Sequence, residues 1–136
     1  TDLDQAFFKF QTDATNSEAF DDYTVLHFIY SVNGTDYITA MPITVAANTK
    51  YDLVIDIDSS RTVTVWVNGL QYNLTQTAGS TGGTTATRVQ PSEVPVRSKA
   101  LTDDIDLIPY IGIEAGAAAA EAVDVHYTGI SRVIFE

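Results

Sequence analysis

The residues of this 136-residue chain that could bind a metal ion are two groups of aspartates. Asp52, Asp56 and Asp58 alternate along one stretch, and Asp-x-Asp spacing can supply oxygen ligands to Ca²⁺. An EF-hand loop would need a glycine and another acidic residue after them, and neither follows. We therefore interpret this group as the solvated face of a strand, and we expect no metal or cofactor. The second group, in a loop, is Asp103, Asp104 and Asp106, and we expect no metal there either.

Residues for acid–base or nucleophilic catalysis are sparse. The two histidines, His27 and His126, have apolar neighbours and no second histidine at metal-ligand spacing, so we interpret both as structural. Glu121 and Asp124 are the nearest match to the carboxylate pair of a sandwich glycosidase, but the second glutamate is missing. No G-x-S-x-G elbow or phosphate-binding loop is present. We expect no catalytic residue and predict that the protein is not an enzyme.

The composition of the chain narrows the classes of partner that it is expected to bind. The net charge of −11 disfavours nucleic acid, whose phosphates are also negative. No apolar run reaches about 18 residues, and the N-terminus lacks a basic segment followed by an apolar one, so neither a membrane nor a secretory signal is expected. The absence of cysteine excludes disulfides and thiolate metal sites. Hydrophobic residues make up 45% of the chain, which supports the core of one domain over residues 1–136.

The clearest structural pattern lies between Tyr51 and Thr75. Apolar and acidic residues alternate in its first part, as in a strand with one buried and one wet face. Asn68-Gly69 is typical of a type I′ hairpin turn, which needs positive φ at both positions. We predict three consecutive antiparallel strands. They are Tyr51–Asp58, Thr62–Asn68 and Leu70–Thr75, with Leu53, Ile55, Ile57, Val63, Val65 and Val67 buried.

Short strand patterns continue on both sides of this meander. Thr24–Val32 is apolar on both faces, which predicts a central strand, and Asn33-Gly34 predicts the hairpin that follows it. Pro42 permits only an edge or strand-end position. Eight to ten short strands without a certain helix indicate an all-β sandwich or jelly roll. The remaining strands are expected within 2–11, 36–41, 106–113, 123–127 and 131–135.

A long arm, Gln76–Asp106, interrupts this pattern. It is rich in Thr, Gly and Ser, contains Pro91 and Pro95, and predicts neither a helix nor a long strand. Loops of this size are usually functional or disordered. Our hypothesis is an assembly element ordered mainly by another subunit; the alternatives are a mobile loop and a glycan-contacting loop. The candidate partner-binding residues are Arg88, Val89, Val94, Val96, Arg97 and Lys99.

Two aromatic residues could stack on a sugar ring. Trp66 and Tyr72 lie in the predicted meander, but large aromatics more often fill a core, and we favour a core position for both. Carbohydrate binding without catalysis stays open as an alternative.

The residues of the meander also resemble a known family. YDLVIDIDSSRTVTVWVNGLQY, with Val65-Trp66-Val67-Asn68-Gly69, resembles the central hairpin of concanavalin A-like (laminin-G-like) jelly rolls. The closing stretch, with Pro109–Gly112 before a small-residue turn and then Asp124 and Tyr127, is similar to the end of such domains in virion proteins of tailed phages. The resemblance covers roughly half of the chain.

The resemblance implies an antiparallel β-sandwich of the concanavalin A-like jelly-roll type with one long loop or arm. It further implies a structural protein of the virion surface: a capsid decoration, head-fibre or tail-fibre subunit, assembled as a homotrimer. The expected partners are copies of itself and a major capsid or tail protein. The alternative is a lectin-like carbohydrate-binding module that recognises a cell-surface glycan.

Overall fold

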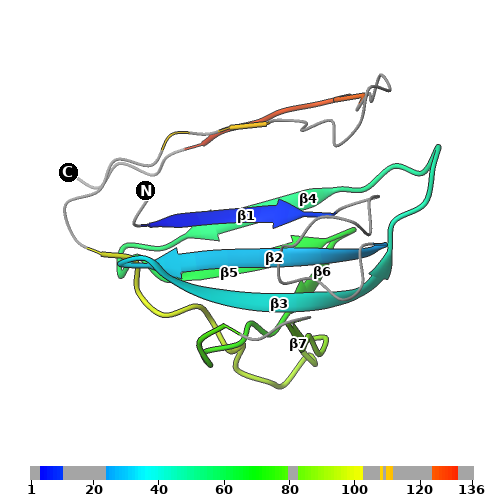
Figure 1. Ribbon diagram of the computed structural model, residues 1–136. Helices are drawn as coiled ribbons and strands as arrows, with labels where there is room; N and C mark the ends of the chain where they lie inside the picture. The colour runs from blue at the N-terminus through cyan, green and yellow to red at the C-terminus, as the bar shows by residue number, and fades with distance from the viewer. Residues whose placement is uncertain are drawn as a thin grey trace.

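The computed structural model describes residues 4–10, 24–79, 83–102, 108, 110–111 and 124–131. Within them the chain is all-β, as predicted, and forms two sheets (Figure 1). These residues contain no helix of the length and apolarity needed to cross a membrane. The strands are β1 (Gln5–Lys9), β2 (Val25–Val32), β3 (Thr35–Thr44), β4 (Leu53–Ile57), β5 (Val63–Val67), β6 (Leu70–Tyr72) and β7 (Thr84–Thr85).

The larger sheet has the order β1-β2-β3-β7. Its strand β2 is hydrogen-bonded on both sides and buried on both faces, which confirms the predicted central strand. Asn33 and Gly34 join β2 to β3 with φ of 50° and 77°, as a type I′ turn requires. Pro42 lies inside β3, where the register with β2 shifts. Pro42 is not at a strand end, but β7 pairs with β3 only at Thr39 and Ala40, so among the described residues Pro42 lies at an edge position, as one of the two predicted alternatives allows.

The smaller sheet has the order β4-β5-β6, and both pairs are antiparallel, as predicted for the meander. Asn68 and Gly69 form its second turn with φ of 51° and 76°. One strand pair departs from the expected antiparallel architecture: β7 lies parallel to β3. The parallel pair arises because the arm returns to the β3 edge after leaving the other sheet.

The core lies between the inner faces of the two sheets. On β5, Val63, Val65 and Val67 are at most 1% exposed, which confirms their predicted burial. The rings of Phe8 and Phe28 meet edge-on at 5.1 Å between centroids. The buried core residues are Leu26, Phe28, Tyr30, Tyr37, Met41, Val63, Val65, Val67, Tyr72, Leu74, Ala86 and Leu101.

Strand β4 does not share this burial, and the prediction for its residues is wrong. Leu53, Ile55 and Ile57 are 41%, 38% and 37% exposed, although each is paired with one of the buried valines of β5. Among the described residues β4 pairs only with β5, so it is an edge strand. The alternation in the sequence predicts which face these residues occupy, but burial also requires a layer above that face.

Candidate functional site

Residues 83–102 of the arm, here called the docked segment, form hydrogen bonds with the two sheets of their own chain. It first follows β3, where Ala86 N–H donates to Ala40 O at 2.8 Å. It then pairs with β6 and with Asn73, the residue after β6. Val89 N–H donates to Gln71 O at 3.0 Å, and Asn73 N–H donates to the Thr87 carbonyl. This half of the docked segment therefore bridges the edges of the two sheets.

The second half of the docked segment takes the place beside β5 that the short strand β6 leaves empty. Ser98 N–H donates to Val63 O at 3.1 Å, and the Ser98 hydroxyl accepts from Val63 N–H at 2.8 Å. Leu101 N–H donates to Arg61 O at 3.0 Å. Ser98 and Leu101 are 2% and 1% exposed, so this half completes both the sheet and the core.

These contacts give residues 83–102 partners on their own chain, and our hypothesis that another subunit orders the arm stays a prediction. The hypothesis counted the arm's few apolar residues, whereas its backbone hydrogen bonds and three buried residues, Ala86, Ser98 and Leu101, hold the docked segment on its own chain. Partner binding by its exposed side chains stays a prediction. Of the six candidates, Val89 is half-buried, Val94 and Val96 are 86% and 44% exposed, and Arg88, Arg97 and Lys99 are exposed.

Two of the three basic candidates also have contacts on their own chain. Arg97 forms an ion pair with Asp58. The ammonium of Lys99 lies 5.1 Å from the centroid of the Tyr37 ring, in a cation–π arrangement. Nearby, the Tyr30 hydroxyl donates to Thr75 O at 2.7 Å and accepts from Lys99 N–H at 3.2 Å, and burial raises the pKa of Tyr30 to about 12.

Asp58 fixes the β4–β5 turn and the docked segment together. Its carboxylate accepts from Ser60 N–H and Thr62 N–H, both at 2.9 Å, from the Thr62 hydroxyl at 2.7 Å, and from Arg97. Partial desolvation opposes ionisation, but these donors outweigh it and hold the pKa of Asp58 below its ordinary value.

The other acidic residues are placed differently. Asp52 and Asp56 are exposed on the same hairpin as Asp58, and the described residues contain no group of three metal-ligand side chains. The second aspartate group, at 103, 104 and 106, and Glu121 lie outside the described residues.

Asp4 is a structural anchor that sequence reasoning missed, because a lone aspartate before a strand carries no distinctive signal. Its carboxylate accepts from Asn33 N–H at 2.8 Å, from Thr102 N–H at 2.5 Å and from the Thr102 hydroxyl at 3.0 Å. Desolvation acts against the charge, yet the three hydrogen bonds lower the pKa of Asp4. Asp4 thus joins β1, the β2–β3 turn and the end of the docked segment.

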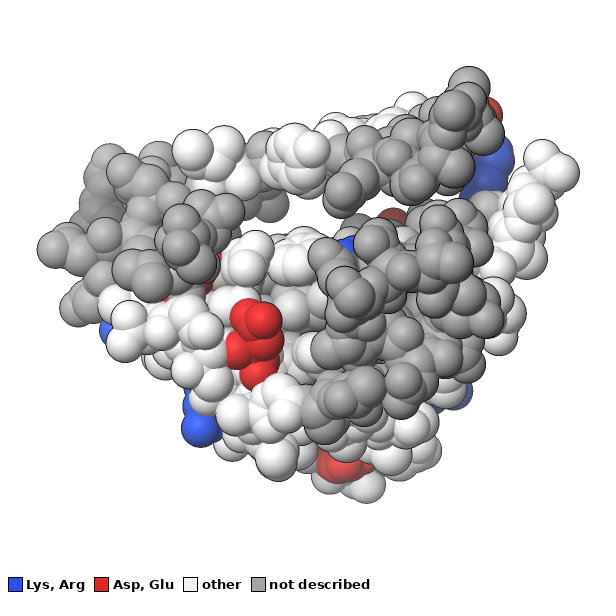
Figure 2. All heavy atoms as spheres, viewed as in Figure 1, with Lys and Arg blue, Asp and Glu red and all other residues white. Residues whose placement is uncertain are grey.

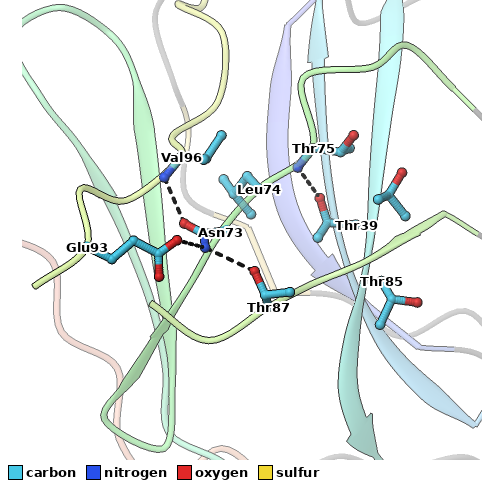
Figure 3. A pocket seen from close by; sticks show the side chains of 9 residues that line it. Thr39, Asn73, Leu74, Thr75, Thr85, Thr87, Glu93 and Val96 are labelled. Atoms are coloured by element: carbon cyan, nitrogen blue, oxygen red, sulfur yellow. Dashed lines mark hydrogen bonds between the residues drawn. The ribbon is translucent and has the colours of Figure 1, made fainter. Parts of the chain in front are cut away.

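A polar pocket of about 290 Å³ lies where the docked segment crosses from one sheet to the other (Figure 3). The Asn73 side-chain amide donates to Thr87 Oγ1 and to Glu93 Oε1, both at 3.0 Å, and accepts from Val96 N–H at 2.8 Å. Asn73 therefore organises the pocket wall and has no donor left for a ligand. The lining residues are Thr39, Asn73, Leu74, Thr75, Thr84, Thr85, Thr87, Glu93 and Val96.

The residues considered for catalysis or stacking separate into buried and exposed ones. His27 is 2% exposed, with Nδ1 2.9 Å from Val25 O, as a structural histidine should be. His126 is exposed, so its structural interpretation is wrong. Tyr72 belongs to the core, but Trp66 is only half-buried on the outer face of β5, because its side chain points away from the core valines. The core interpretation therefore holds for Tyr72 alone.

The side of the sandwich away from the docked segment is here called the open side. It comprises β1, β4 and the segment Asp124–Ser131, which lies beyond these strands in Figure 1. All eight residues of the segment are exposed, and no strand is assigned to them, so the predicted strand at 123–127 is not found in its described part. Figure 2 shows this side of the molecule as a space-filling view. The exposed large apolar residues here are Leu53, Val54, Ile55, Ile57, Val125, Tyr127 and Ile130.

Comparison with protein-family models, with curated proteins and with solved structures finds no match for this chain. Its function is therefore argued from its own residues.

Proposed function

We propose that this chain is a non-catalytic structural subunit of a tailed-phage virion, a capsid-decoration or head-fibre protein that assembles as a homo-oligomer, with a trimer as the expected state. The sandwich would be a concanavalin A-like jelly roll. The virion assignment is supported by the resemblance of Val65–Gly69 and of the closing stretch to such proteins. Self-assembly is supported by the structure of the open side.

The observation that carries the proposal is the exposure of β4. Leu53, Val54, Ile55 and Ile57 are 37% to 43% exposed, so both faces of the strand present apolar side chains to solvent. Natural edge strands are usually protected by charged side chains, proline or a bulge, and Asp56 is the one such residue in β4. An exposed apolar edge of this kind marks an interaction surface.

Native mass spectrometry of the wild-type chain over a hundredfold range of concentration tests this function. We expect a single oligomer, with three times the chain mass, that dissociates only on dilution. A chain that stays monomeric at every concentration would contradict the proposal.

Trp66 favours a second candidate, a lectin-like module. Its indole is half-buried on the outer face of the smaller sheet, beside the exposed Val54 and the half-buried Gln71. A partly exposed ring is a stacking platform for a sugar. Because Trp66 is the only tryptophan, its fluorescence reports directly on such binding. A saturable change on adding glycans, absent in Trp66→Leu, would support the lectin; no change with any glycan would contradict it.

A further inference from the structure

We propose that the edge of β4 is paired in the assembled protein by the segment Asp124–Ser131 of a second copy of this chain. This inference rests on the proposed self-assembly and names its interface. Each copy would accept one strand at β4 and donate one segment to a neighbour. Such head-to-tail contacts form a ring when the rotation between copies closes and an open filament when it does not, and a trimer needs the closed form.

The acceptor is argued from the abrupt loss of burial across one sheet. Ile55 on β4 and Val65 on β5 are directly paired on the same face, yet their exposures are 38% and 0%. Side-chain burial on this face therefore ends at β5 and does not extend to β4, the edge strand. Within the described part of the chain the outer edge of β4 has no strand beside it, so its backbone groups are available to a further strand.

The donor is argued from its own exposure and pattern. Val125, Tyr127 and Ile130 are 52%, 87% and 72% exposed in a segment without strand pairing. Val125 and Tyr127 alternate with polar residues, so an extended segment would present both on one face. The donor and the acceptor lie on the same side of the molecule, so both face a neighbour (Figure 1).

One antiparallel register satisfies both patterns. If His126 lies opposite Asp56, then Val125 lies opposite Ile57 and Tyr127 lies opposite Ile55. The apolar pairs then share the inner face, and the imidazole and the carboxylate share the outer face, where a ring N–H can donate a hydrogen bond to the carboxylate. Gly129 falls opposite Leu53, where it leaves room for the larger side chain.

A second copy is a better donor than the same chain. Within one copy the segment and β4 both stay exposed although they lie on the same side, so neither covers the other. A neighbouring copy removes both exposed surfaces in one contact, and it adds backbone hydrogen bonds to the side-chain contacts.

Cysteine trapping tests the exchange cleanly, because the chain has no cysteine of its own. Asp56→Cys and His126→Cys variants are purified separately, mixed and oxidised. Directly opposite strand residues have Cα atoms about 4.5–5.5 Å apart, which suits a disulfide. We expect a disulfide-linked dimer in this mixture. Val94→Cys, 86% exposed on the docked segment, is the matched control and should not cross-link with Asp56→Cys.

Two results of the trapping experiment would overturn the inference. One is a mixture that cross-links no better than the Val94→Cys control. The other is a double variant, Asp56→Cys with His126→Cys, that forms its disulfide only within one chain. Either result against an oligomeric wild type would remove the exchange and leave the proposed function standing.

Tyr127→Ser gives a second measurement that does not threaten folding, since this side chain is 87% exposed. We expect its self-association to weaken at least about tenfold by analytical ultracentrifugation, as for loss of an aromatic anchor. An unchanged oligomer would contradict the exchange, whereas a monomeric wild type would contradict the proposed function as well.

Discussion

The two long sides of this sandwich differ in how their edges end. On the β3 and β6 side the docked segment pairs with β3, then with β6, and finally beside β5, and it adds the buried residues Ala86, Ser98 and Leu101. On the open side, β1 and β4 are the outermost strands, and β4 exposes apolar side chains on both faces. The part of the chain that the structure describes thus contains one covered side and one uncovered side.

The difference shows what covers a sheet edge in this chain. The docked segment has low apolar content, and its contacts are mainly backbone hydrogen bonds and polar side chains such as Asn73, Asp58 and Asp4. The segment Asp124–Ser131 is richer in large apolar residues yet stays exposed. Hydrophobicity alone therefore does not decide which segment docks; backbone pairing with complementary polar anchors does.

The largest expected effect comes from equivalent leucine deletions on the two sides. Leu101→Ala empties a buried site on the covered side and should lower the free energy of unfolding by about 2–5 kcal/mol. Leu53→Ala removes a side chain that is already 41% exposed and should cost about 1 kcal/mol or less in the monomer. Urea denaturation at low protein concentration measures both. Equal losses would show that the two sides do not differ.

Gly83 tests whether the docked segment needs its close approach to β3. Its φ is +74°, and a Cβ would lie 2.8 Å from Ile38 Cγ2 and 3.1 Å from Ile38 O. Gly83→Ala should therefore destabilise by about 1–3 kcal/mol through backbone strain and overlap. Gly69→Ala is the matched control, since its φ is +76° but nothing lies within 4 Å of a Cβ there. Thermal melts that give the two variants equal losses would contradict the close approach.

Acid should weaken the covered side through Asp4 and Asp58. Both carboxyl pKa values lie below their ordinary value in the folded chain, because hydrogen bonds to the carboxylates outweigh partial desolvation. A lowered folded pKa gives stability that is present above the unfolded pKa and is lost as pH falls through the folded one. Asp58→Ala should thus cost about 1–2 kcal/mol at pH 7 and progressively less below pH 4. Asp52→Ala, on the same hairpin, is the control; a cost for Asp58→Ala that does not change with pH would contradict this account.

Much of the fold could be predicted from sequence, because it depends on local patterns. Asn33-Gly34 and Asn68-Gly69 specify two turns through their backbone preferences, and alternation specifies the strands between them. Burial of β4 could not be predicted in the same way, since Ile55 and Val65 have the same local pattern. Their 38% and 0% exposures depend on which strands lie above and beside them, and that is decided by distant residues.

The site was less predictable than the fold, because its contacts join residues that are distant in sequence. Asp4 and Thr102 are 98 positions apart in sequence, and no spacing rule relates them. Asp58 was noticed as a possible calcium ligand, but its role in the turn requires knowing that Arg97 lies beside it. Polar anchors of this kind become visible only when the fold brings their partners together.

The smallest expected effect concerns the ion pair between Arg97 and Asp58. The two side chains are 47% and 27% exposed, so solvent screens their attraction. We expect Arg97→Ala to cost about 0.5 kcal/mol at low salt and almost nothing at 1 M salt, where the Debye length falls to about 3 Å. Because Asp58 also holds the turn, only a double-mutant cycle with Asp58→Ala isolates the pair. Arg88→Ala on the same segment is the control for removing a basic side chain. If the coupling energy stays above about 1 kcal/mol at 1 M salt, Arg97 holds the docked segment by packing rather than by charge, and the covered edge depends on it more than we infer.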